Sequence, residues 1–197
     1  MTHASLPDGP LVAAALAGDE TAFAALVDRY RPALLRGAIS RLGREDWGED
    51  AVQETFFCVF KSLRTYDSRF SFRTWLWTIL INQCKRQFAK QQRLGRVTGN
   101  DVGQATQERQ SPEPSPADQL LARERAGELS RLLARLPEAQ ADALRLRFFG
   151  ELKFHEIAAA LDCSVSAAKQ RVKSGLEQLS AWLQPTASPG SSARNHA

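Results

Sequence analysis

The stretch from Phe70 to Phe88 constrains the fold most, because its apolar residues recur at helical spacing over more than one face. Ser71 stands where its hydroxyl can accept a backbone N–H bond of the first turn and cap the helix. Trp75 lies at the border between the apolar arc and a narrower polar sector. The apolar arc contains Phe72, Leu76, Ile79 and Leu80 on one face and Trp77, Ile81, Cys84 and Phe88 on the next. We therefore expect a helix that is buried on more than one side.

The remaining sector of this helix is polar and cationic. It carries Thr74, Thr78, Asn82, Lys85, Arg86 and Arg93. The surrounding residues 61–96 hold nine basic side chains and one acid, Asp67, although the whole chain has a net charge of only +4. A cationic strip edged by aromatic rings can hold phosphates and stack bases. The pattern favours a nucleic-acid partner, and the simpler alternative is a core helix whose Lys and Arg side chains extend into water.

Composition narrows the function classes. The chain has 197 residues, enough for one domain or two small ones. Its three cysteines, Cys58, Cys84 and Cys163, form neither a disulfide framework nor a zinc-binding spacing, which suits a reducing cytoplasm. No apolar run reaches the length of a membrane span, and the N-terminus lacks a signal-peptide pattern. Without a paired nucleophile and base, a phosphate loop or a metal cluster, we expect no catalytic residue, no metal and no cofactor.

The N-terminal half is predicted to be a four-helix unit. Gly18 and Gly43 stop helical patterns, and Asp19 can cap the second helix. The helices are expected at residues 11–17, 19–43, 49–63 and 70–92, with a turn over 44–48 and a loop over 64–69. No strand pattern occurs in this half, so the fold class is all-α.

The third of these helices has a second distinctive face. Opposite its core stripe, Asp50, Gln53, Glu54 and Phe57 share one side. A large aromatic side chain flanked by carboxylates is unusual on a plain solvent face. The pattern indicates a protein-docking surface with an aromatic anchor. The alternative is that Phe57 packs beneath a neighbouring helix.

A linker divides the chain. Glycines and the Ser-Pro-Glu-Pro-Ser-Pro run interrupt helical periodicity between residues 94 and 118, which is typical of a flexible spacer that lets two modules sit far apart. The expected organisation is a first helical domain at 10–93, a linker at 94–118, a second helical domain at 119–183 and a disordered tail at 184–197.

The second domain ends in a helix-turn-helix pattern. A short helix at 154–161 and a turn at 162–165 precede a helix at 166–183. Gln170 and Arg171 carry groups that match base edges in the major groove. Further side chains can hold phosphates or contact DNA beside them. These are Lys153, Ser166, Lys169, Lys173 and Ser174.

The two halves together resemble a bacterial sigma factor of the sigma-70 family, in its short extracytoplasmic-function group. The resemblance covers about residues 10–93 and 119–183. It rests on Asp19-Glu-Thr-Ala-Phe23, Glu49-Asp-Ala-Val-Gln-Glu-Thr-Phe56, Phe72-Arg-Thr-Trp-Leu76 with Ile79 and Asn82, Leu136-Pro137, and Glu156-Ile-Ala158 with Leu161, Ser164, Lys169 and Arg171. It implies two small helical domains, sigma region 2 and sigma region 4, in a cytoplasmic protein that is not an enzyme.

The resemblance also implies partners. Asp50, Gln53, Glu54 and Phe57 fall where the family docks on core RNA polymerase. The −10 promoter element would contact Arg64, Tyr66, Arg69, Arg73, Trp75, Asn82, Lys85 and Arg86. The −35 element would contact Lys153, Ser166, Lys169, Gln170, Arg171, Lys173 and Ser174. Members of this group answer extracytoplasmic or stress signals and are often held inactive by an anti-sigma protein, commonly membrane-anchored, which adds such a protein to the expected partners.

Some positions depart from the family pattern. Arg86 stands where the family often has Asp, Ala167-Ala168 where Thr-Val is usual, and Asp162 where Gly is common. Gly175 lies inside the last helix, where it should cost about 1 kcal/mol relative to Ala. Two alternatives remain: a helix-turn-helix regulator that binds DNA without polymerase, and an interaction protein that has lost promoter recognition.

Overall fold

A computed structural model describes residues 6–98 and 116–183, and every regular element in these two ranges is helical. The first range holds α1 (Asp8–Leu16), α2 (Glu20–Leu42), α3 (Glu45–Ser62), a 3-10 turn η2 (Leu63–Thr65) and α4 (Phe72–Thr98). The second holds α5 (Pro116–Arg135), α6 (Glu138–Phe148), α7 (Phe154–Ala160) and α8 (Val165–Leu183). The all-α prediction is confirmed.

Residues at the helix ends set where several helices begin or stop, as predicted. The Asp19 carboxylate accepts N–H bonds from Thr21 and Ala22, at 2.9 and 3.2 Å, and starts α2. Gly43 ends α2 in the left-handed conformation, with φ 75°. Ser71 accepts the backbone N–H of Thr74 at 3.1 Å and so caps α4.

The start of α3 differs from the prediction. The expected turn over 44–48 is wrong, because α3 already begins at Glu45. Gly48, the last residue of that expected turn, is buried inside the helix. A Cβ there would lie 2.7 Å from the Cγ1 of Ile39, so the glycine lets α3 approach α2 closely. This glycine serves packing, which sequence alone does not distinguish from a turn.

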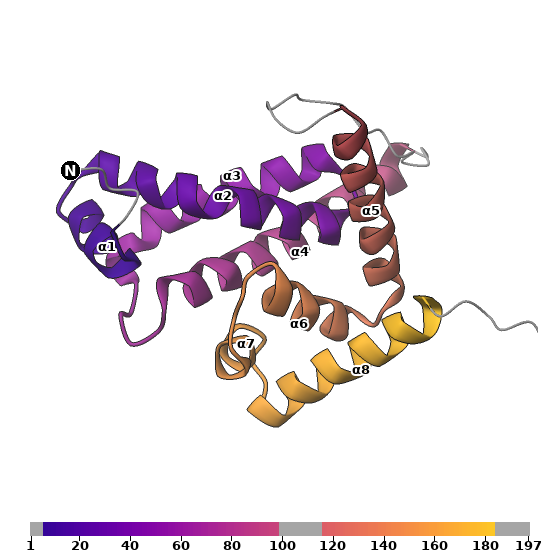
Figure 1. Cartoon of the computed structure of the whole chain (residues 1–197). Helices are drawn as coiled ribbons and strands as arrows, with labels where there is room; N and C mark the ends of the chain where they lie inside the picture. The colour runs from indigo at the N-terminus through magenta and orange to yellow at the C-terminus, as the bar shows by residue number, and fades with distance from the viewer. Residues whose placement is uncertain (1–5, 99–115, 184–197) are drawn as a thin grey trace, which may run out of the picture.

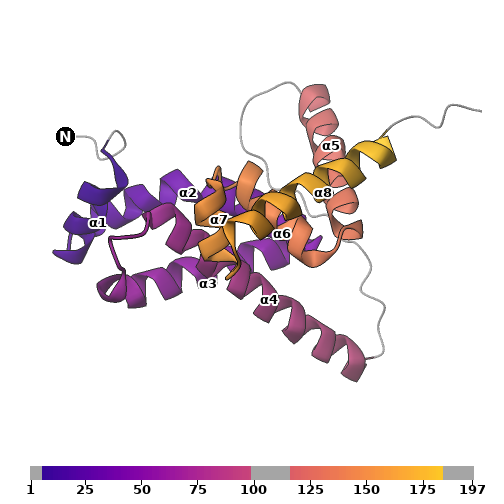
Figure 2. The same cartoon turned by 90° about the horizontal axis from the view of Figure 1, so that it is seen from below.

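The helices form two packed groups (Figure 1). Helices α2, α3 and α4 run side by side with α1 at one end, while α6, α7 and α8 lie together beneath α4. Helix α5 crosses to contact α2. The view from below shows α6–α8 lying over one side of the α1–α4 bundle (Figure 2). The two groups therefore share an interface in this structure. The expectation that the linker lets the two modules sit far apart on a partner stays a prediction.

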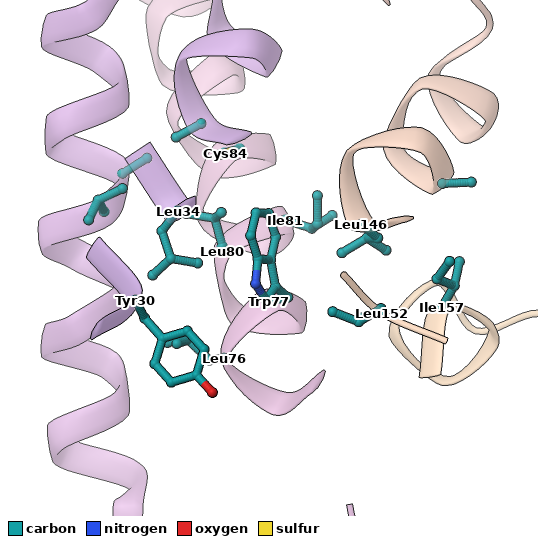
Figure 3. Packing of buried hydrophobic residues seen from close by; sticks show 14 of the residues in the cluster. Tyr30, Leu34, Leu76, Trp77, Leu80, Ile81, Cys84, Leu146, Leu152 and Ile157 are labelled. Atoms are coloured by element: carbon teal, nitrogen blue, oxygen red, sulfur yellow. The ribbon is translucent and has the colours of Figure 1, made fainter. Parts of the chain in front are cut away.

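Trp77 lies at the centre of the apolar part of this interface (Figure 3). Its side chain is 1% exposed. A Cβ on Gly37 of α2 would lie 2.7 Å from the ring, and a Cβ on Gly150, which follows α6, would lie 3.0 Å from it. Leu146 and Leu152 of the second group face the same ring. One aromatic side chain thus packs against both groups.

A buried charge cluster forms the polar part of the interface. Arg145 of α6 donates to the carbonyl oxygen of Ser40 at 2.8 Å and to the Asp142 carboxylate at 3.1 Å. Arg41 of α2 contacts Asp142 at 2.7 Å and Glu138 at 2.5 Å. Burial raises the pKa of Asp142, against the opposing effect of the two arginines, and burial also lowers the pKa of Arg145. Asp142 is thus paired with Arg41 and Arg145, and Arg145 is paired with Asp142 and bonded to Ser40.

Two expectations for α4 need correction. Phe88 was placed in the apolar arc, but it is 49% exposed. Thr74 was placed in the polar sector, but it is buried because the second group covers it. Helix also occupies both ends of the expected 94–118 linker, since α4 continues to Thr98 and α5 begins at Pro116. Residues 99–115 and 184–197, with the rest of the linker and the expected tail, lie outside the described residues, and the domain boundaries stay a prediction.

Candidate functional site

The outer face of α3 presents the predicted protein-docking residues. Asp50, Gln53, Glu54 and Phe57 are all exposed on this helix. Phe57 is 52% exposed and does not pack beneath a neighbouring helix, and the Lys61 ammonium lies 4.0 Å from its ring centre. The inner face of α3 is held by Val52, Thr55 and Val59, which are buried. The side chains that sequence grouped together therefore share one accessible surface, which we call the α3 surface.

Sequence reasoning omitted a neighbouring aromatic residue. Phe60 is 61% exposed and contacts Phe23 of α2 edge-on, with 5.3 Å between ring centres. Together with Phe57 it enlarges the apolar area beside the carboxylates of the α3 surface. Phe60 lies three positions beyond Phe57, so helical spacing could have found it.

The loop between η2 and α4 rests on an aromatic cluster. Tyr66 contacts Trp75 at 5.2 Å and Phe72 at 5.8 Å between ring centres, and Phe72 contacts Tyr30 of α2. The Tyr66 hydroxyl also donates to the carbonyl oxygen of Phe70 at 2.6 Å. Tyr66 and Trp75 keep part of their rings accessible. Rigid rings packed in this way hold the loop in one shape and leave aromatic surface for stacking.

The predicted cations near this loop are in different environments. Arg64 and Arg69 are exposed, and Arg69 pairs with Asp67 at 2.5 Å, which raises the pKa of the guanidinium. Arg73 is half-buried and contacts Glu151 of the second group at 3.0 Å. It also lies 5.9 Å from the centre of the Tyr30 ring.

The remaining predicted residues of α4 lie further along the helix. Asn82, Lys85 and Arg86 are exposed. Arg86 lines a groove between α3 and α4, together with Ala51, Glu54, Gln83, Gln87 and Lys90. Asn82, Lys85 and Arg86 lie further along α4 than the aromatic cluster at its start, so the eight predicted residues are not brought into one cluster.

The helix-turn-helix is formed by α7 and α8. Ala168, Val172, Gly175 and Leu179 form the buried stripe of α8. The predicted contact residues lie mostly outside this stripe. Lys153, Ser166, Lys169, Gln170 and Lys173 are exposed, while Arg171 and Ser174 are half-buried. Gln170 donates to the Ser174 hydroxyl at 2.9 Å, so these two polar groups are already paired on the surface.

Gly175 has a packing role that sequence reasoning did not assign. A Cβ at this position would lie 2.8 Å from the Cδ1 of Leu144 in α6. The glycine therefore lets α8 cross α6 closely, at the cost in helix propensity noted above. Glu156 was also missed as a contact residue: its carboxylate accepts the Lys153 backbone N–H at 2.8 Å and starts α7.

Three further features concern metal binding, membrane spanning and cysteine reactivity. Among the residues with described side chains, no group of three or more His, Cys, Asp or Glu is placed to hold a metal ion. Within the same residues, no helix is both long and apolar enough to cross a membrane. Burial raises the pKa of Cys84 to about 12, which keeps it a thiol in the core.

Comparisons with known proteins agree with this arrangement. The family model for Sigma-70 region 2 matches residues 26–94, and the model for Sigma-70, region 4 matches residues 126–179. The RNA polymerase sigma factor NccH of Alcaligenes xylosoxydans xylosoxydans is 33% identical over 186 residues, covering 93% of this chain and 98% of that one. The ECF RNA polymerase sigma-E factor of Escherichia coli K12 is 30% identical over 190 residues, covering 91% and 96% of the two chains.

Solved structures show the same fold. CnrH in complex with the cytosolic domain of CnrY matches with a TM-score of 0.69 and 26% identity, covering 89% of this chain and 96% of that one. The sigma factor RpoE in complex with the anti-sigma factor NepR, from Bartonella quintana, matches with a TM-score of 0.65 at 23% identity, covering 82% and 96%. The chain belongs to the sigma-70 family, in its ECF group. It is a sigma factor, a protein that directs the initiation of transcription.

Proposed function

We propose that this sigma factor docks on core RNA polymerase through the α3 surface. The observation that supports this most is the exposure of Phe57 at 52% beside Asp50, Gln53 and Glu54. An accessible aromatic anchor surrounded by polar groups is the usual composition of a protein hot spot. A regulator that binds DNA without polymerase would have no use for such a surface, which argues against that alternative.

Promoter DNA is assigned to two further surfaces. The loop and α4 residues Arg64, Tyr66, Arg69, Arg73, Trp75, Asn82, Lys85 and Arg86 would capture the −10 element, whose unstacked bases suit aromatic rings and cations. Helix α8, with Ser166, Lys169, Gln170, Arg171, Lys173 and Ser174, would read the −35 element in the major groove, and Lys153 would hold a phosphate. The polymerase performs the chemistry, so the protein itself is not an enzyme.

Regulation follows from what the relatives bind. The matched structures of CnrH and RpoE contain a partner protein, named an anti-sigma factor for RpoE. An anti-sigma factor is therefore the expected inhibitor here too, and it would be released by an extracytoplasmic or stress signal. The protein would work in the cytoplasm, where the polymerase is, and an inhibitor anchored in the inner membrane would hold it there.

The double variant Gln53→Ala/Glu54→Ala is expected to reduce specific transcription at least about tenfold, because truncating interface hot spots costs more than about 1 kcal/mol each. The measurement is in vitro transcription with purified core polymerase on a fragmented genomic library. Asp28→Ala, an exposed acid on α2, is the matched control and should transcribe like the wild type. If both variants retain full transcription, the α3 surface is not the docking site. If no specific starts appear even with wild-type protein, the interaction-protein alternative applies.

Arg171→Ala and Lys169→Ala should weaken transcription in different ways. Loss of a base-reading arginine is expected to cost about 1–3 kcal/mol and to relax specificity at one −35 position. Loss of a phosphate-binding lysine should weaken binding to all DNA sequences alike. It should also reduce the slope of log affinity against log salt concentration by about 1. A promoter library randomised over the −35 element measures both effects. Identical sequence profiles for Arg171→Ala and the wild type would remove Arg171 from base readout.

A further inference from the structure

Helix α1 packs against the base of the loop that precedes α4. Its residues Leu11 and Val12 are buried, and the helix contacts η2, where that loop begins. Figure 1 shows α1 at the end of the bundle from which the loop leads into α4. The match to the Sigma-70 region 2 model starts at residue 26, so α1 lies outside it. A helix in this place is close enough to influence the shape of the proposed −10 surface.

Asp8, the first residue of α1, contacts two side chains of α2. The Tyr30 hydroxyl donates to one oxygen of the Asp8 carboxylate, and the Arg29 guanidinium contacts the other oxygen at 2.6 Å. Arg29 also donates to the carbonyl oxygen of Leu6 at 2.5 Å. Burial, and next the hydrogen bond to Asp8, raises the pKa of Tyr30 to about 12. The phenol is therefore protonated and is the donor in this contact.

Tyr30 in turn lies against the start of α4. Its side chain is 4% exposed, and its ring packs on Phe72 with 5.8 Å between ring centres. Figure 3 shows the same ring beside Leu76. The Arg73 guanidinium lies 5.9 Å from the centre of the Tyr30 ring. Burial lowers the pKa of Arg73, but Tyr30 and the Glu151 carboxylate raise it, and the net change is an increase.

These contacts form a chain of groups from α1 to α4. A hydroxyl that donates to a carboxylate is polarised, and its oxygen becomes a better acceptor for a guanidinium. The Asp8 carboxylate thus acts on Arg73 through Tyr30. All three residues belong to the first domain, so this chain of contacts does not depend on the second domain.

We infer that Asp8 and Tyr30 are positioning residues for the −10 surface, which hold the Arg73 guanidinium where it contacts a phosphate of the promoter strand. Helix α1 is then a part of this surface, although none of its own residues is proposed to touch DNA. A purely structural role would instead lower stability without a specific effect on Arg73. This inference rests on the proposed assignment of Arg73 to the −10 surface.

Asp8→Asn and Tyr30→Phe test the two links of the chain separately. Both changes nearly keep the size of the side chain, and Tyr30→Phe also keeps the ring on Phe72. Asp28→Asn, at an exposed acid of α2, is the control with the same change of charge. Each full-length protein is bound to core polymerase. The affinity for a labelled single strand, from the −10 element of a promoter that the wild type transcribes, is then measured at several salt concentrations.

Asp8→Asn and Tyr30→Phe are each expected to weaken strand binding about threefold or more, a size typical of residues that act through another side chain. Each should also reduce the slope of log affinity against log salt concentration by about 0.7, the value for one phosphate contact on a single strand. Removal of an acid by itself favours DNA binding, so weaker binding by Asp8→Asn cannot come from its charge. Asp28→Asn should bind equally or more tightly.

Two results would overturn the inference. Wild-type affinity in either variant would remove that residue from the positioning of Arg73. Weaker binding with an unchanged salt slope would mean that the substitution damages the fold in general, because no phosphate contact would have been lost.

Arg73→Ala separates the inference from the proposed function. If Arg73 contacts the strand, Arg73→Ala weakens binding, and adding Asp8→Asn or Tyr30→Phe should cause no more than about 1.5-fold further loss, since the side chain they position is gone. Additive losses in these double variants would reject the positioning role.

Strand binding by Arg73→Ala at the wild-type level would instead remove Arg73 from the −10 surface, and the assignment beneath the inference would fail. Weaker binding by Arg73→Ala together with wild-type binding by Asp8→Asn and Tyr30→Phe would keep that assignment and reject only the positioning role.

Discussion

Replacing Trp77 with Ala is expected to lower the free energy of unfolding by about 3–5 kcal/mol, the usual cost of truncating a large buried aromatic side chain. The ring is 1% exposed and fills the space between Gly37 of α2 and Gly150 of the second domain. Gly37 and Gly150 themselves have no side chain that could move into the cavity. Urea denaturation followed by circular dichroism measures it.

Trp182→Ala is the matched control for this prediction. Trp182 lies near the end of α8, is half-buried, and has the Arg135 guanidinium 4.3 Å from its ring centre. Its loss should cost about 1 kcal/mol, in the range of a partly exposed cation–π contact. Similar losses for the two tryptophans would contradict the central position of Trp77.

Replacing Asp142 with Ala is expected to cost the packed arrangement about 3–5 kcal/mol, because it leaves a buried arginine without its carboxylate. Arg145 is 3% exposed and has Asp142 as its ion-pair partner, while Arg41 keeps Glu138. Domain separation would let water reach Arg145, so the variant should open before it unfolds. Calorimetry should then show two transitions in place of one cooperative transition.

A charge-free variant distinguishes the loss of an ion pair from the loss of packing. Arg41→Met/Asp142→Leu/Arg145→Met replaces the cluster with apolar side chains, a change that is often neutral or stabilising for buried pairs. We expect this triple variant to regain a single transition. Two transitions in both variants would mean that the volume of the cluster, not its charge balance, holds the domains together.

Much of the fold could be predicted because its signals are local. Asp19, Gly43 and Ser71 act on the backbone within a few residues, so their types and positions predict where α2 and α4 begin or end. Apolar spacing also identified most of the buried face of α4. Gly48 and Gly175 were harder, because a glycine in a helix permits close packing only when a particular partner, Ile39 or Leu144, comes from elsewhere in the chain.

The candidate site likewise has one part that could be predicted from the sequence and one part that could not. The α3 surface follows from the geometry of one helix, so Asp50, Gln53, Glu54 and Phe57 could be grouped from sequence. The covered turn of α4 could not be predicted, because Glu156 is 82 residues from Thr74. On α6, Asp142 and Arg145 carry charges three positions apart, which usually indicates a solvated helix face. Their burial depends on α2 lying against them.

The contact between Gly175 and Leu144 bears on the engineering of promoter choice. If α8 reads the −35 element as proposed, a helix taken from another sigma factor with a larger residue at the position of Gly175 would press on the Leu144 side chain, and either that side chain or the helix would have to shift. A shift of the helix would bring its side chains to different base pairs even if every proposed reading residue were kept. The unit to transplant is therefore α8 together with the part of α6 around Leu144, so that the helix keeps the packing partner that sets its position.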